Sequence, residues 1–113
     1  MKEDVVRKLI QLFPELREAI KSNIEDFPEI YLHLIFGDVF NPYLCVLLEK
    51  PQKNQEGIKK SGELLEYMAN LDVDIQEVVA FTVLERLSDS EEKFGLFYKY
   101  AGEKTRQFMN EFK

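Results

Sequence analysis

The sequence is poor in the residues that build disulfides and histidine- or cysteine-based metal centres. It contains one cysteine, Cys45, and one histidine, His33, among 113 residues. A lone cysteine cannot form an internal disulfide, and the chain shows neither a charged and apolar leader nor a run of roughly eighteen apolar residues. We therefore expect a soluble cytoplasmic protein that does not engage a membrane.

Lysine and arginine are missing from two long stretches, residues 22–49 and residues 61–85. The acidic residues of these stretches are Glu25, Asp26, Glu29, Asp38 and Glu49, and then Glu63, Glu66, Asp72, Asp74, Glu77 and Glu85. With a net charge of −6, this segregation argues against nucleic-acid binding, which depends on clustered basic side chains. We expect a basic protein partner, and we expect the two acidic stretches to share one face of the protein.

The sequence also lacks any segment that alternates apolar and polar residues in the manner of a strand. Its periodic segments instead repeat apolar residues every three or four positions, as amphipathic helices do. With 45% hydrophobic residues, the chain can bury one core. These patterns predict a single all-α domain over residues 1–113. Its six to seven short helices would form either an α-solenoid-like arrangement, which the helical hairpin at residues 64–89 favours, or an irregular helical bundle.

Two helices are expected before residue 26. The first is amphipathic and ends near Pro14, where the second begins, because proline is tolerated in a first helical turn. Asp26 is then the expected N-cap of a third helix, with Pro28 in its first turn and Glu29 completing a capping box.

A bend is expected at residues 37–38, where the third helix meets Gly37 and Asp38. Asn41 followed by Pro42 is typical of an N-cap and a first helical position, so a fourth helix is predicted over residues 42–49. Pro51 ends that helix.

Residues 64–89 predict two antiparallel helices joined by an acidic turn. Asp74 is the expected N-cap of the second helix, and Glu77 completes a capping box. The apolar stripe of this helix comprises Ile75, Val78, Val79, Thr82, Val83 and Leu87, with Ala80 and Phe81 widening the buried arc. After it, Ser90 can cap a further helix, Gly102 fits a helix C-terminus, and residues 105–112 predict a last short helix.

The second helix of this hairpin resembles that of a HEAT-type repeat. The likeness rests on Asp72, Asp74, Val78, Ala80, Val83, Leu84 and Leu87, while Gln76 and Glu77 stand where the repeat usually has an arginine. The segments FGDVFNPYL and VVAFTVLERL together resemble a family of small, uncharacterised all-helical bacterial proteins. Several such proteins resemble immunity partners of bacterial polymorphic toxins, which implies a one-to-one protein inhibitor rather than an enzyme.

The segment over residues 36–43 has two interpretations. Its aromatic residues either fill the core at a bend or, beside an acid and an amide, form the centre of a protein interface. On the second interpretation the partner-binding residues are Phe36, Asp38, Phe40, Asn41 and Tyr43, together with Asp72 and Asp74 of the hairpin turn.

The residues that could take part in catalysis or metal binding are isolated from one another. A general base can be drawn from His33 with Glu29 one helical turn earlier, but no nucleophile or glycine-rich loop accompanies them. Cys45 lies among apolar residues and suits a buried thiol. Glu63 and Glu66 share a helix face without the histidine that a diiron site requires. We therefore expect no catalytic residue, no cofactor and no metal.

Three functions remain open on this sequence. The first is a protein-binding module, an immunity-type inhibitor whose acidic helical surface blocks a basic toxin. The second is a generic helical interaction or assembly subunit, which includes a homo-oligomer. The third is an enzyme that uses His33 and a carboxylate. The sequence favours the first.

Overall fold

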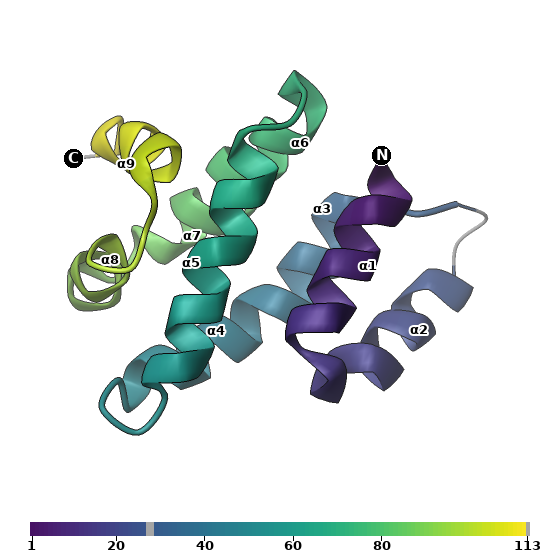
Figure 1. Cartoon of the computed structure of the whole chain (residues 1–113), viewed down its shortest axis with the longest axis horizontal. Helices are drawn as coiled ribbons and strands as arrows, with labels where there is room; N and C mark the ends of the chain where they lie inside the picture. Colours follow the sequence, from purple (N-terminus) through teal and green to yellow (C-terminus); the bar gives the residue numbers. More distant parts are fainter. Residues whose placement is uncertain (27–28, 113) are drawn as a thin grey trace.

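Helix α5 lies at the centre of the fold in a computed structural model that describes residues 1–26 and 29–112 (Figure 1). Figure 1 shows α1, α2 and α3 on one side of α5, and α8 and α9 on the other. The elements in chain order are α1 (Lys2–Leu12), η1 (Pro14–Leu16), α2 (Arg17–Glu25), α3 (Leu32–Ile35), η2 (Phe36–Phe40), α4 (Asn41–Glu49), α5 (Gln55–Ala69), α6 (Val73–Glu77), η3 (Val78–Leu84), α7 (Glu85–Leu87), α8 (Glu91–Tyr98) and α9 (Glu103–Asn110).

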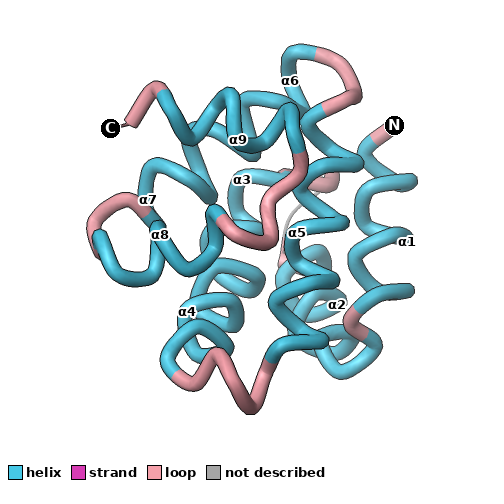
Figure 2. Tube along the Cα trace, turned by 60° about the vertical axis from the view of Figure 1, so that its left-hand side comes forward, coloured by secondary structure: helices cyan, strands magenta, loops and turns pink. Residues whose placement is uncertain are grey.

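Several of these elements join end to end into longer helices. The π-helix η2 links α3 to α4 without a break, and the π-helix η3 links α6 to α7. The described residues therefore form 7 helices, which make up 79% of these residues, and they include no strand (Figure 2). The prediction of an all-α fold with six to seven helices is confirmed.

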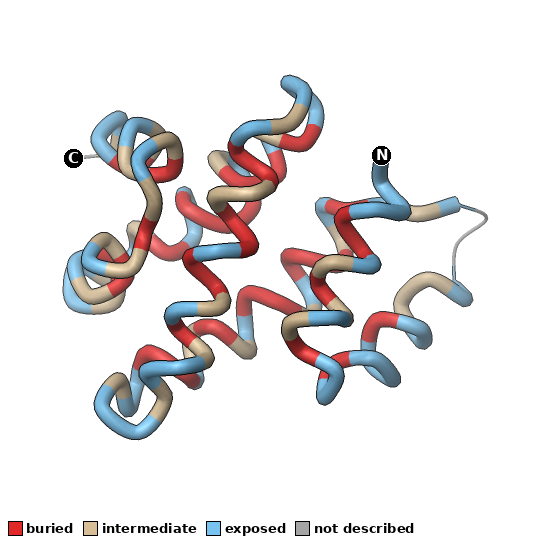
Figure 3. The backbone as a smooth tube through the Cα atoms, in the orientation of Figure 1, coloured by how far each residue is buried: buried red, intermediate tan, exposed pale blue. Residues whose placement is uncertain are grey.

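The helices bury their apolar sides against one another, so the buried residues line the inner faces of the bundle (Figure 3). The largest fully buried side chains include Phe13, Phe36, Phe40 and Phe97. A Cα radius of gyration of 13.1 Å is close to the roughly 13 Å of a compact domain of this size. The arrangement is thus the irregular bundle, with the predicted hairpin of α5 and α6–η3–α7 inside it.

The expected third helix begins later than predicted. Asp26 ends α2 in helical geometry instead of capping a new helix, and α3 starts at Leu32 after an extended Tyr31. Glu29 therefore precedes the helix and does not complete a capping box. Pro28 lies outside the described residues.

The predicted bend at residues 37–38 and the N-cap at Asn41 are also wrong. Asn41 has helical dihedrals, and its backbone N–H reaches back to the carbonyl of Phe36 in the pattern of a π-turn. Pro42 has no N–H to donate. The Gly37 carbonyl accepts instead from Nη1 of Arg86, at 3.3 Å. The wider π-turn thus accommodates Pro42 within a continuous helix, where a break was expected.

This continuous helix, Leu32–Glu49, has a mean hydropathy of 1.3 over 18 residues, enough by length and composition to cross a membrane. Within the fold, 44% of it is buried. Its inner side carries Ile35, Phe36, Phe40, Leu44 and Leu48, which all belong to the main core. These contacts are those of a central core helix.

The hairpin and the C-terminal helices follow the sequence pattern more closely. Asp72, not Asp74, caps α6, because its Oδ1 accepts a hydrogen bond from the backbone N–H of Ile75 at 3.2 Å. Ser90 caps α8 as predicted, accepting from the N–H of Lys93 at 3.2 Å. Gly102 occupies the N-cap of α9 in extended geometry, so its predicted place at a helix C-terminus is wrong.

Candidate protein-binding surface

A small pocket opens where the start of α3 meets α6. It has a volume of about 300 Å³ and is lined by Lys2, Tyr31, Leu32, His33, Leu34, Asp74, Ile75, Glu77 and Val78. Residues from both lysine-free stretches therefore meet here, with Asp74 and Glu77 facing the segment that carries Tyr31 and His33.

The acids of this surface have no basic partner within the part of the chain that the structure describes. Asp74, Glu77 and Glu85 are exposed, and none of them forms an ion pair there. Lys2, which also lines the pocket, directs its ammonium group to the carbonyl of Ile30 at 3.3 Å. The negative charge of this face is consequently open to an external basic group.

Phe81 lies one turn beyond the pocket and contradicts the prediction that it is buried. Its exposed fraction is 58%, whereas Val78, Thr82 and Val83 on the same helix are buried. Glu77 and Glu85 precede and follow Phe81 by four residues, so the three side chains fall along one outer face of the helix. We call Asp74, Glu77, Phe81 and Glu85 the acidic strip.

The helix that carries the acidic strip is tied firmly to α3–η2–α4. His33 Nδ1 forms a hydrogen bond with the hydroxyl of Thr82, and Asn41 Nδ2 donates to the carbonyl of Thr82 at 2.7 Å. Arg86 donates to Gly37, as described above. Because its opposite side makes these contacts, the helix holds Phe81 and its acids in a fixed position.

Two of the predicted partner-binding aromatics are in the core. Phe36 and Phe40 are fully buried and pack with ring centroids 5.3 Å apart, so neither is available on the surface. Tyr43 is half-buried and donates a hydrogen bond from its hydroxyl to the Glu15 carboxylate. Partial burial and the Glu15 carboxylate raise the pKa of Tyr43 to about 12. Of the two interpretations of residues 36–43, the structure therefore agrees with the one in which the aromatic residues fill the core.

The polar members of the predicted set are dispersed. Asn41 is buried, and its Oδ1 has no hydrogen-bond partner within the described residues. Asp38 is exposed and accepts from Asn23 of α2 at 3.4 Å, whereas Asp72 caps α6 and only Asp74 lines the pocket. The structure thus brings Asp74 into the acidic strip and leaves Asp38 beside α2.

The groups considered for chemistry have structural partners. Glu29 is not on the helix of His33, whose ring bonds to Thr82 instead. Cys45 is half-buried against the core. Glu66 binds the start of α9, and Glu63 lies 3.7 Å from Lys8. No group of three or more His, Cys, Asp or Glu side chains is placed to hold a metal ion in residues 1–26 and 29–112.

Sequence reasoning missed Phe81 as a surface residue, although a signal for it was present. The series Glu77, Phe81, Glu85 has the spacing of one helix face, and two of its three members are charged. A face with charged residues on both sides of an aromatic is a solvent face, so the aromatic in its middle is exposed with them.

The chain was compared with known protein families, curated proteins and solved structures. A family profile described as "Domain of unknown function (DUF7674)" matches residues 6–113, which span the fold from within α1 to its end. No curated protein and no solved structure matches the chain. The profile's description states no activity, so the functional argument rests on the surfaces of this chain.

Proposed function

The chain belongs to the DUF7674 family of domains of unknown function, and we propose that it is a protein-binding module whose acidic strip binds a basic partner protein. The observation that carries this proposal is the exposure of Phe81, at 58%, between acids that have no ion-pair partner in the described residues. Aromatic residues are enriched at the centres of protein interfaces, and Phe81 is a large aromatic held outward on a rigid helix.

The aromatic ring and the acids contribute to such a contact in different ways. Burial of an exposed phenyl ring in a partner pocket supplies apolar area, and hot-spot side chains contribute about 2 kcal/mol or more. The carboxylates of Asp74, Glu77 and Glu85 raise the association rate of a basic partner and disfavour acidic proteins. The pocket beside Tyr31 can receive a side chain of the partner next to Phe81.

An immunity-type inhibitor is the specific form of this module that we favour. The resemblance of the segments at residues 36–44 and 78–87 to small helical bacterial proteins supports it, since several such proteins resemble immunity partners of toxins. A one-to-one complex with a basic toxin domain would place the acidic strip over that site. A generic assembly subunit would use the same strip without inhibiting its partner.

Site-specific photocrosslinking tests the proposal. A photoreactive amino acid replaces Phe81 in one variant and Val46 in a control, because Val46 is equally exposed, at 60%, but lies on α4. Cells from the source organism supply the partner. A discrete basic protein crosslinked only through position 81 is the expected result. Equal adducts from both positions, or none from position 81, would contradict the proposed surface.

The crosslinked protein also separates the two forms of the module. If its catalytic activity falls when the chain is added in equal amount, the complex is an inhibitor complex. If its activity is unchanged, the chain is an assembly subunit. Turnover of a small molecule by the isolated chain, lost when His33 is replaced, would favour the enzyme instead.

A further inference from the structure

We infer that the groove between α1 and α2 is a second docking site, which receives an acidic amphipathic helix of a partner protein. The groove has a volume of about 650 Å³, within the range of ligand-binding sites. None of the residues that line it belongs to the acidic strip or to the pocket beside it. It therefore stands apart from the surface of the proposed function.

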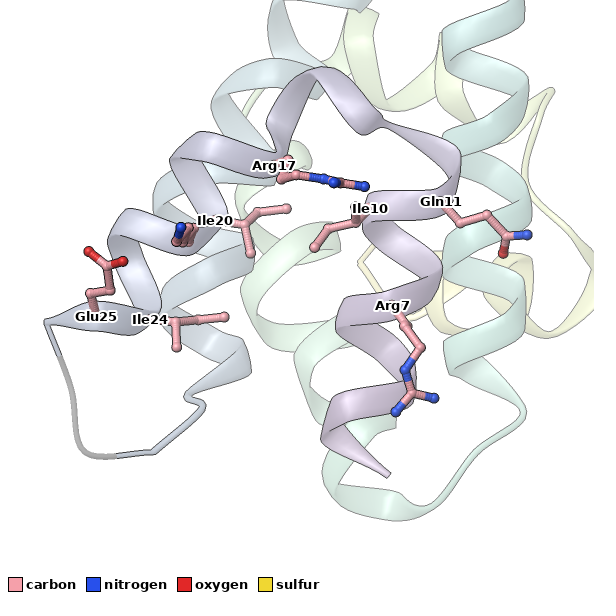
Figure 4. A pocket seen from close by; sticks show the side chains of 8 residues that line it. Arg7, Ile10, Gln11, Arg17, Ile20, Ile24 and Glu25 are labelled. Carbon is pink, nitrogen blue, oxygen red and sulfur yellow. The ribbon is translucent and has the colours of Figure 1, made fainter.

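The floor of the groove is apolar and comes from both helices. Ile10 of α1 and Ile20 and Ile24 of α2 point toward one another in Figure 4. Ile20 is the one fully buried residue of α2, while Ile10 and Ile24 remain half-buried. The apolar side of α2 is thus incompletely covered by the described part of the chain.

The rims of the groove are cationic. Arg7 lies on the α1 side, and Arg17 and Lys21 lie on the α2 side. Arg7 pairs with Asp4 at 2.7 Å, whereas Arg17 and Lys21 form no ion pair within the residues that the structure describes. Arg17 and Lys21 are also four residues apart on one helix, where like charges repel. An external carboxylate between them would relieve that repulsion.

The distribution of these cations decides the occupant. A fatty acid carries one carboxylate and would need its cations gathered at one end of an enclosed channel. Here Arg7 stands on the α1 side and Arg17 and Lys21 on the α2 side of an open groove, which spans residues 17–24 of α2, or about two helical turns and roughly 10 Å at 1.5 Å per residue. A helix with one apolar face and acids on its flanks matches this geometry, because it fills the floor and meets both rims.

The net charge of the chain adds to the electrostatic complementarity between this groove and an acidic helix. The protein as a whole has a charge of −6, so an acidic partner is repelled from most of its surface. Glu25, at one end of the groove, is the single acid among its lining residues. An acidic helix would consequently be directed to this groove and away from the acidic strip.

Fluorescence anisotropy with a labelled synthetic peptide tests this inference. The probe has about 18 residues, enough to form a helix, with leucine on one face and glutamate on both flanks. A second probe replaces every glutamate by lysine. The groove variant is Arg17→Glu/Lys21→Glu, and the matched control is Lys53→Glu/Lys59→Glu, which makes the same charge change at exposed residues outside the groove.

The expected result is saturable binding of the acidic probe, weakened about tenfold or more in the groove variant and unchanged in the control. The lysine probe should not bind the groove. A neutral variant, Arg17→Gln/Lys21→Gln, should weaken binding less than charge reversal, and circular dichroism shows that each variant is folded. Equal binding by the groove variant and the control, or no binding up to about 1 mM peptide, would overturn the inference.

Two further measurements assign the groove to another occupant if the inference is wrong. Sedimentation of the unliganded protein that shows self-association, lost in the groove variant, would make a second copy of this chain the occupant. Stoichiometric binding of oleate without binding of the acidic peptide would make the groove a lipid site. Either result would overturn docking of a partner helix.

Discussion

The carboxylate of Glu66 in α5 binds the first turn of α9 through Thr105. Its Oε1 accepts hydrogen bonds from the backbone N–H of Thr105 at 3.0 Å and from the Thr105 hydroxyl at 2.8 Å. Oε2 accepts from the backbone N–H of Lys104 at 3.2 Å. Glu66 thus satisfies free N–H groups of α9 from another helix and places negative charge at its N-terminus.

Replacing Glu66 by glutamine should lower the free energy of unfolding by about 1–3 kcal/mol at neutral pH, because the amide is uncharged and its NH2 group cannot accept a hydrogen bond as the second carboxylate oxygen does. Urea denaturation measures this change. Glu63→Gln is the control, since Glu63 is exposed on the same helix and its one ionic contact, to Lys8, is long at 3.7 Å. An equal loss in both variants would contradict the capping role of Glu66.

The effect of Glu66 should also depend on pH. Partial burial raises the pKa of this carboxyl, but the hydrogen bonds from Thr105, Lys104 and Asn70 outweigh burial and hold the pKa below its ordinary value of 4.5. A folded-state pKa below the unfolded value means that the stabilisation is complete above the unfolded pKa and is lost as the pH falls through the folded pKa. The stability difference between wild type and Glu66→Gln should therefore narrow below pH 4.5.

Gly62 should not tolerate even alanine. A Cβ atom at this position of α5 would lie 2.2 Å from the carbonyl oxygen of Tyr100, which belongs to the backbone and cannot rotate away. We expect Gly62→Ala to destabilise by about 1–3 kcal/mol, although alanine favours helix. Gly95→Ala is the control, because nothing lies within 4 Å of its Cβ position. Thermal unfolding of both variants checks this, and an unchanged melting temperature for Gly62→Ala would refute the close packing of α5 against residue 100.

Val79→Asp should destabilise the hairpin strongly, by about 3–5 kcal/mol, because it places an unpaired carboxylate at a fully buried position. Val73→Asp makes the same chemical change at the first position of α6, where the side chain is 64% exposed. There the change should stay within about 0.5 kcal/mol. Urea denaturation measures the free energy of unfolding of both variants. Comparable losses would mean that positions 73 and 79 do not differ in burial.

The sequence predicted the helices well where local chemistry determines them. Ser90 caps α8 because its hydroxyl meets a nearby backbone N–H, and proline at residues 14 and 51 stands at helix boundaries in both prediction and structure. The stripe from Ile75 to Leu87 is buried as its spacing indicates. These features depend on residues within one or two turns of one another.

The errors arise where distant contacts decide the local conformation. Pro42 and Gly37 predict a break, yet Arg86 supplies the hydrogen bond that the proline cannot, and the helix continues through a π-turn. Phe81 is hydrophobic enough for the core, but it lies on the outer face of its helix with Glu77 and Glu85, while the opposite side of that helix packs against α3–η2–α4. Such choices depend on tertiary packing, so the acidic strip could not be found from hydrophobicity alone.

His33→Ala should weaken partner binding without abolishing it, because His33 lines the pocket beside the acidic strip and bonds to the helix that carries the strip. The imidazole is bonded within the protein to Thr82, so its removal deprives a buried hydroxyl of its partner and should cost about 1 kcal/mol of stability. Isothermal titration with the partner identified by crosslinking should show an affinity that is lower than that of wild type but still measurable. Loss of all activity in a variant with an unchanged circular dichroism spectrum would instead support an enzyme that uses His33.

The central claim is that the acidic strip binds a basic protein. Its most direct test is the rate at which the protein associates with the partner identified by crosslinking, measured at about 0.05 M and 0.5 M salt. Wild type is compared with Asp74→Asn/Glu77→Gln and with the control Asp38→Asn/Glu56→Gln, which removes the same charge from exposed residues that do not line the pocket. The acidic strip predicts that high salt slows association of wild type and control roughly tenfold or more, and that the strip variant associates slowly at both salt concentrations. Association that ignores salt, or a strip variant that associates as fast as the control, would contradict the proposal that this surface binds a basic protein.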